Sequence, residues 1–216
     1  MTRYFSCQNG NKIKKDCYLC KKRNMKNILC FEGEWLFNDD KKKNRFSLNT
    51  EPALRMLQEY YKCETTYRHI LSKEDLQHYI NFFNSHKHEW NKIGIIYIAC
   101  HGWFHSLSLE GEDGNVDLKE LADMAGDFFR DKIVHFSCCK TLANTQEVEQ
   151  FKNITGARLV CGYKKSVDAM KSAIADVALL NELITSNKPG NIKNEEVSTF
   201  RKTYKSLLDD LRFDVV

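Results

Sequence analysis

Short apolar runs alternate along this chain with longer stretches in which apolar residues recur at the spacing of an α-helix. The mainly apolar runs are 27–32, 95–100, 132–138 and 157–163, and their length and their β-branched and aromatic residues predict strands. A further strand is predicted over 65–71, where apolar and polar residues alternate. Helices are predicted between and after them, over residues 50–62, 72–90, 117–131, 145–155, 166–185 and 195–211.

The order of these elements predicts the fold class. Parallel neighbours in a sheet need crossover connections, and a helix after each strand supplies them. The run 95–100 is continuously apolar, which is typical of a central strand that helices cover on both faces. We therefore expect an α/β fold, specifically a three-layer α/β/α sandwich with a mainly parallel sheet.

Length and composition favour one domain. A chain of 216 residues with 42% hydrophobic residues can bury one sizeable core, and no linker rich in glycine and serine interrupts it. Residues 27–216 are expected to form that domain and the basic residues 1–26 an appendage, because they offer little apolar area to bury. A net charge of only +4 is weak evidence for nucleic-acid binding. Because the stretch 10–26 is basic, nucleic-acid binding remains a less favoured alternative.

The nine cysteines indicate a reducing compartment. Their number is odd, the polar start of the chain lacks the pattern of a secretory signal, and no apolar run approaches the length of a membrane helix. We therefore expect a cytoplasmic protein with free thiols and no membrane anchor. Cys7, Cys17, Cys20 and Cys30 are candidate zinc ligands, but Cys30 falls in a predicted core strand and no histidine lies near the others. Neither a metal nor another cofactor is predicted.

Candidate chemistry lies where two of the predicted strands end. His101 and Gly102 follow the third strand, and Cys138 and Cys139 lie at the end of the fourth. Ligands of open parallel sheets bind at the carboxyl ends of the strands, and consecutive strands are usually neighbours. We therefore expect an imidazole and a thiol to meet at one edge of the sheet. Because successive strand residues point to opposite faces, Cys139 is expected to face the cleft and Cys138 the core.

The segments IIYIACHGW (95–103) and VHFSCCKTL (134–142) resemble the His-Gly and Cys blocks of the caspase-like cysteine peptidases, most closely those of the CHAT type. This resemblance implies a caspase-like fold and a cysteine endopeptidase acting on a protein or peptide. It implies Cys139 as the nucleophile, His101 as the catalytic histidine and Gly102 as a backbone donor of the oxyanion hole. The caspase pentapeptide Q-A-C-[RQG]-G is absent, so cleavage after aspartate is not implied.

These residue types fit the chemistry of peptide-bond cleavage by a thiol. A thiolate attacks the amide carbonyl, an imidazole protonates the leaving amine near neutral pH, and a glycine lets a backbone N–H come close to the oxyanion. Asp168 follows the fifth strand at the same edge, and by analogy with related peptidases it is a candidate to line a pocket for a basic substrate side chain. Its alternative role is structural, in the first turn of the helix that begins there.

Two other function classes remain open. The first is a catalytically silent caspase-like module that binds a partner protein through the same fold. The second is a nucleic-acid-binding or nucleotide-handling protein, although no glycine-rich phosphate loop follows the first strand. Small CHAT-like peptidases resemble components of larger systems, often of bacterial defence, in which a sensor controls cleavage. Because no sensor segment is recognisable in the sequence, the resemblance implies a regulatory protein that acts in trans.

Overall fold

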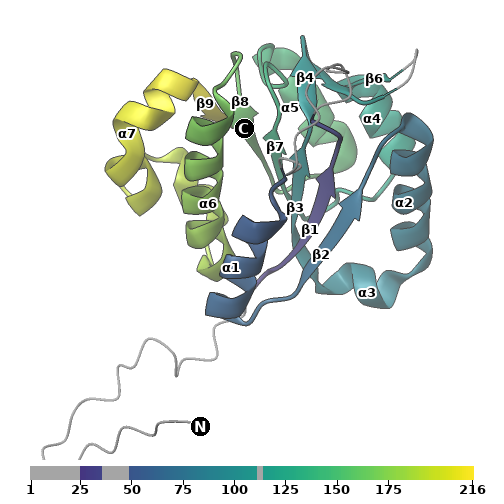
Figure 1. The fold of residues 1–216 in the computed structure, drawn as a ribbon, viewed down its shortest axis with the longest axis horizontal. Helices are drawn as coiled ribbons and strands as arrows, with labels where there is room; N and C mark the ends of the chain where they lie inside the picture. The colour runs from purple at the N-terminus through teal and green to yellow at the C-terminus, as the bar shows by residue number, and fades with distance from the viewer. Residues whose placement is uncertain (1–24, 36–48, 111–113) are drawn as a thin grey trace, which may run out of the picture.

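A computed structural model describes residues 25–35, 49–110 and 114–216. Within them, a six-stranded sheet lies between two layers of helices (Figure 1). Its strand order is β2-β1-β3-β7-β8-β9, and every neighbouring pair is parallel except β8 and β9. The predicted fold class is therefore confirmed: the protein is an α/β/α sandwich with a mainly parallel sheet.

The chain forms the large sheet from strands distributed along its whole described length. These strands are β1 (Asn27–Glu32), β2 (Thr65–His69), β3 (Ile93–Ala99), β7 (Ile133–Ser137), β8 (Leu159–Tyr163) and β9 (Phe213–Val215). A smaller antiparallel sheet follows β3 and consists of β4 (His101–Trp103), β5 (Ser106–Ser108) and β6 (Asn115–Asp117). The helices are α1 (Glu51–Tyr61), α2 (Lys73–Ser85), α3 (Lys87–Lys92), α4 (Leu118–Ala125), α5 (Thr145–Thr155), α6 (Ala169–Thr185) and α7 (Thr199–Leu211), with a 3-10 turn at Pro189–Lys193.

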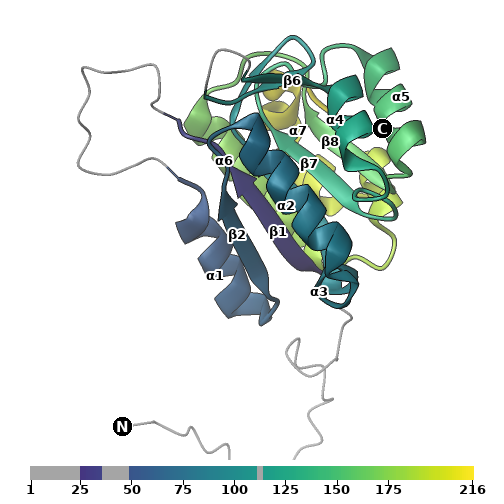
Figure 2. The same ribbon diagram turned by 90° about the vertical axis from the view of Figure 1, so that its right-hand side faces the viewer.

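The helices divide between the two faces of the large sheet (Figure 1, Figure 2). Helices α1, α6 and α7 cover one face, α2 to α5 cover the other, and each face has its own apolar core. Alternation along β1 illustrates this division, because Leu29 and Phe31 belong to the core under α2 to α5, whereas Ile28 and Cys30 belong to the core under α1 and α6. Because a strand that is buried on both faces presents both of its alternating sets of side chains to a core, apolar residues predominate along it, which explains the apolar runs of the sequence.

Local sequence determines where several helices begin and end. The helix predicted over 72–90 begins at Ser72, which forms a complete capping box with Asp75. It is divided at His86 into α2 and α3, because the backbone of His86 leaves the helical region. The third predicted helix ends earlier than expected, at Gly126, where a φ of +54° suits glycine.

The folded domain includes Met25 and Lys26, which precede β1. Of the predicted appendage 1–26, residues 1–24 lie outside the described residues, as do Cys7, Cys17 and Cys20. The backbone N–H of Lys26 donates to the Ile184 carbonyl (3.0 Å), and Met25 packs against the core under α1 and α6. In the described parts of the chain, no helix is both long enough and apolar enough to cross a bilayer.

Candidate functional site

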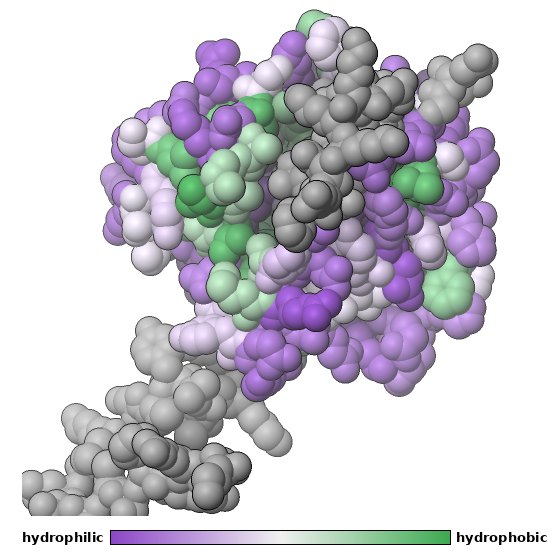
Figure 3. Space-filling model, viewed as in Figure 1, coloured by the Kyte–Doolittle hydropathy of each residue, from purple (hydrophilic) through white to green (hydrophobic). Residues whose placement is uncertain are grey.

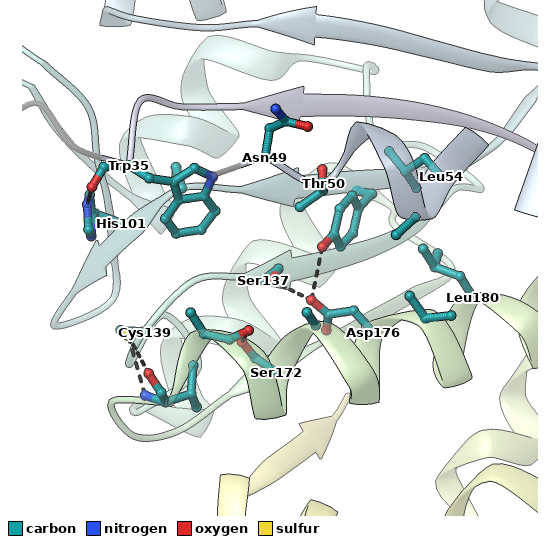
Figure 4. A pocket seen from close by; sticks show the side chains of 17 residues that line it. Trp35, Asn49, Thr50, Leu54, His101, Ser137, Cys139, Ser172, Asp176 and Leu180 are labelled. Carbon is teal, nitrogen blue, oxygen red and sulfur yellow. Dashed lines mark hydrogen bonds between the residues drawn. The ribbon is translucent and has the colours of Figure 1, made fainter. Parts of the chain in front are cut away.

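A pocket of about 320 Å³ reaches the carboxyl edge of the sheet on the face that α1 and α6 cover (Figure 4). Helix α1 contributes Leu54 to its wall, helix α6 contributes Leu180, and strands β3 and β7 contribute Tyr97 and Ser137. The pocket therefore lies between two helices and the sheet, at the edge where parallel α/β sheets bind their ligands.

His101 and Cys139 both line this pocket and lie at the same end of it (Figure 4). They come from neighbouring strands, because β3 pairs with β7 and Ala99 is aligned with Ser137. His101 follows Ala99 by two positions, and Cys139 follows Ser137 by two positions. The structure thus places in one pocket the imidazole and the thiol that were predicted to meet.

Gly102 packs directly on the main chain of Cys139. A Cβ atom at position 102 would lie 2.3 Å from the Cys139 carbonyl oxygen and 2.9 Å from the Cys139 nitrogen. Separations this short are not compatible with a side chain, so glycine is required for the two strand exits to touch. The two strand exits are therefore in main-chain contact at Gly102 and Cys139.

The imidazole of His101 is held by a backbone carbonyl. Its Nε2 lies 2.8 Å from the carbonyl oxygen of Trp35, which can only accept, so Nε2 carries a hydrogen. In the neutral ring the lone pair is then on Nδ1, which makes Nδ1 the basic nitrogen. The Trp35 indole also meets the imidazole edge to face, with ring centroids 5.5 Å apart. Trp35 therefore fixes the orientation of the imidazole through its backbone carbonyl and its indole ring.

Glu32 holds Trp35 and the start of α1 in place. Its buried carboxylate accepts hydrogen bonds from Trp35 Nε1 (2.6 Å), from the backbone N–H and hydroxyl of Thr50, and from the Tyr67 hydroxyl (2.7 Å). Burial and the nearby carboxylate raise the pKa of Tyr67, so Tyr67 stays a hydroxyl donor. Glu32 is the last residue of β1, and its hydrogen bonds link Trp35 to Thr50, both of which line the pocket.

The two adjacent thiols differ as predicted. Cys139 is half-buried, lines the pocket, and accepts a hydrogen bond at Sγ from the Val167 N–H (3.4 Å). Cys138 is only 1% exposed, and its sulfur lies 3.5 Å from the sulfur of Cys100. Burial raises the pKa of the Cys138 thiol, which keeps it protonated. Only Cys139 of this pair faces the cavity.

A buried polar cluster forms the floor of the pocket. The carboxylate of Asp176, on α6, accepts from His135 Nε2 and the Tyr163 hydroxyl at Oδ1, and from Ser137 and Tyr97 at Oδ2, at distances of 2.5–3.0 Å. Burial disfavours both charges, but the ion pair with Asp176 raises the pKa of His135 and lowers that of Asp176. The floor is therefore an imidazolium–carboxylate pair with its hydrogen bonds satisfied.

The role of Asp176 was not predicted from the sequence. A recognisable sign was present, because Asp176 lies on the apolar stripe of α6 and His135 lies in an otherwise apolar strand. Buried charged groups are nearly always paired, so two such residues on packed elements are expected partners.

Asp168 does not line this pocket. It is exposed, and its carboxylate accepts hydrogen bonds from the backbone N–H groups of Met170 and Lys171 at the start of α6. The structure therefore assigns Asp168 the role of helix N-cap, and its candidacy for a substrate pocket is not supported by this geometry. Among the described residues, no group of three or more His, Cys, Asp or Glu side chains is placed to hold a metal ion.

Comparisons with known proteins identify a family but no activity. No curated protein matches the chain. Residues 25–215, which include every described element of both sheets, match a family of unknown function (DUF6642). The chain therefore belongs to the DUF6642 family.

Proposed function

We propose that this protein is a cysteine endopeptidase in which Cys139 is the nucleophile and His101 its catalytic partner. The observation that carries the proposal is that both side chains line one end of one pocket, on neighbouring strand exits, with the imidazole oriented by the Trp35 carbonyl. This arrangement has the three parts that a thiol hydrolase needs: a nucleophile, a base, and a group that orients the base. It also supports the resemblance to caspase-like peptidases of the CHAT type.

The reaction follows from these parts. The Cys139 sulfur attacks the substrate carbonyl carbon, the carbon–sulfur bond forms, and His101 accepts the thiol proton. The amide carbon–nitrogen bond then breaks, and His101 returns the proton to the leaving amine. Water hydrolyses the resulting thioester, releasing the carboxylic acid and restoring the thiol. Gly102 and Cys139 offer backbone N–H groups for the oxyanion, which the contact between their main chains holds close together.

The main alternative is a catalytically silent module with the same fold. That alternative predicts that no thiol is open to solvent, whereas Cys139 is only half-buried and lines the end of a cavity, which favours catalysis. The proposal includes a cytoplasmic location, a protein or peptide substrate, and a regulatory protein that acts in trans. These three points rest on the cysteine content and on the resemblance.

Thiol-directed labelling tests the proposal. The full chain is treated with a peptide carrying an acyloxymethyl ketone, and mass spectrometry of the digested protein identifies the modified cysteine. We expect modification at Cys139, its loss in Cys139→Ala, and strong slowing in His101→Ala. Cys138→Ala is the matched control, because it removes the neighbouring core thiol; it should lose about 1 kcal/mol of stability and still be labelled.

Hydrolysis of a peptide library by the same variants, with melting curves for each, then separates chemistry from folding. Cleavage should disappear in Cys139→Ala and persist in Cys138→Ala. Cleavage that survives in Cys139→Ala would show that the nucleophile is wrongly assigned.

A further inference from the structure

We infer that the pocket beside Cys139 binds an uncharged, apolar side chain of the substrate residue whose carbonyl is attacked. This inference rests on the proposed peptidase function and specifies its substrate class. It differs from the sequence-based expectation of a pocket for a basic side chain, which relied on Asp168. Three properties of the pocket carry it: its walls, the state of its single carboxylate, and its size.

The walls of the pocket are apolar. Helix α1 contributes Ala53 and Leu54, and helix α6 contributes Ala173, Val177 and Leu180. Apolar side chains continue outside the pocket, because Ala173 and Val177 also line a shallow groove between α1, α6 and α7. Figure 3 shows apolar residues gathered on this side of the molecule. A substrate side chain that enters the pocket therefore leaves water for a hydrophobic surface, which is favourable only if it is apolar itself.

The single carboxylate of the pocket is already neutralised. Asp176 is the only acidic residue among the described residues that line the cavity. Each of its oxygens accepts two hydrogen bonds, which uses the four positions that a carboxylate offers. The imidazolium of His135 balances its charge from the side of the sheet, and both residues are buried. An arriving guanidinium or ammonium group would find neither an open acceptor nor an unbalanced negative charge.

Charged substrate side chains are disfavoured for this reason. A cation in the pocket would lose its hydration without gaining a counter-ion, and a buried unpaired charge is strongly unfavourable. An acidic side chain is also disfavoured, because no lysine or arginine is found among the described residues that line the pocket. His101 lies at the end with Cys139 and not at the far end, where the substrate side chain would be placed. The pocket therefore discriminates by charge against both classes.

The size of the pocket suits a large side chain. Its volume of about 320 Å³ greatly exceeds the space of one water molecule, about 30 Å³ in the liquid. Leucine, methionine or phenylalanine can extend from the end with Cys139 and His101 toward Leu54 and Leu180, which lie at the far end in Figure 4. Small residues would leave much of this apolar surface in contact with water, so they are expected to bind less well.

Four peptide acyloxymethyl ketones that differ only in the residue next to the electrophile test this inference. The residues are leucine, phenylalanine, arginine and aspartate, and the measured quantity is the second-order rate of modification at Cys139, read by mass spectrometry. We expect the leucine or phenylalanine probe to react faster than the arginine and aspartate probes by about tenfold or more. Faster reaction of the arginine or aspartate probe at Cys139 would overturn the inference and leave the proposed function standing. Absence of Cys139 modification by all four probes would overturn both.

A pair of variants on α6 tests whether the pocket itself sets this preference. Val177→Asp introduces an unpaired carboxylate into the wall, and we expect it to raise the arginine-to-leucine rate ratio by about tenfold or more. Ala178→Asp is the matched control, because Ala178 is also half-buried but lines only the outer groove. An unchanged ratio in folded Val177→Asp, or an equal change in Ala178→Asp, would show that specificity is set elsewhere. Melting curves establish folding, and the wild-type series decides the inference if Val177→Asp does not fold.

Discussion

Replacement of Asp176 by asparagine is the sharpest test of the buried cluster under the pocket. Asp176 is 2% exposed, and its carboxylate lies 2.5 Å from Nε2 of His135. Asparagine has nearly the same shape but no charge, and it offers one acceptor oxygen in place of two. In Asp176→Asn, His135 therefore loses its counter-ion, and the donors at one carboxylate oxygen lose their acceptor.

The cost can be estimated from the burial of the pair. Removing one partner of a buried ion pair destabilises a protein by about 3–5 kcal/mol, because the other charge is left uncompensated. His135 can escape part of this cost by releasing its proton, so the lower end, about 3 kcal/mol, is expected. For a domain of this size, that corresponds to a decrease of about 6–12 °C in melting temperature.

The pH dependence of stability also reports on the ion pair between His135 and Asp176. The raised pKa of His135 stabilises the fold fully below its unfolded pKa of about 6.5, and this contribution is lost as pH rises through the folded pKa. The lowered pKa of Asp176 stabilises the fold fully above its unfolded pKa of about 3.9, and this contribution is lost as pH falls through the folded pKa. The difference in the free energy of unfolding between wild type and Asp176→Asn should therefore be largest between about pH 4 and 6.5 and should decrease above that range.

Urea unfolding of both proteins at several pH values between 5 and 9 measures this difference. Asp168→Asn is the matched control, since it removes a carboxylate from the start of the same helix, and asparagine caps helices as well as aspartate does. The control should change stability by less than about 0.5 kcal/mol. The reasoning is refuted if Asp176→Asn unfolds at the same urea concentration as Asp168→Asn, or if its difference from wild type does not depend on pH.

Two further substitutions test the contacts that build the site. Gly102→Ala places a methyl group against the Cys139 carbonyl oxygen, so we expect a loss of about 1–3 kcal/mol and slower probe labelling; unchanged melting and labelling would contradict the contact. Glu32→Gln replaces an acceptor oxygen that Trp35 or Thr50 uses by an amide N–H group, so we expect a loss of about 1–3 kcal/mol in urea unfolding and a shift in tryptophan fluorescence; a variant as stable as wild type would show that these hydrogen bonds contribute little.

The fold was largely predictable because its determinants are local. The apolar runs of the central strands, the Ser72 capping box and the helix over 145–155 each depend on neighbouring residues alone, and the structure contains all of them. Strand β9 was not predicted, because Phe213–Val215 is a short segment whose pairing with β8 depends on the path of the preceding helix. The division at His86 was missed because apolar residues continue at helical spacing across it.

The candidate site was only partly predictable, and the reason lies in which atoms form it. Side chains with distinctive chemistry, such as His101 and Cys139, are visible in a sequence, and the parallel order of the strands indicates that they meet. The partner of the imidazole is a backbone carbonyl, which every residue possesses, so no residue type marks position 35. The order of the strands places the Trp35 carbonyl beside His101. Strand β1 lies beside β3 with Glu32 aligned to Ala99, so the residues that follow these two strands leave the sheet side by side. The orienting group of this site is therefore encoded in the topology of the sheet and in the hydrogen bonds of Glu32, and a different side chain at position 35 would retain the carbonyl while losing the indole that anchors it.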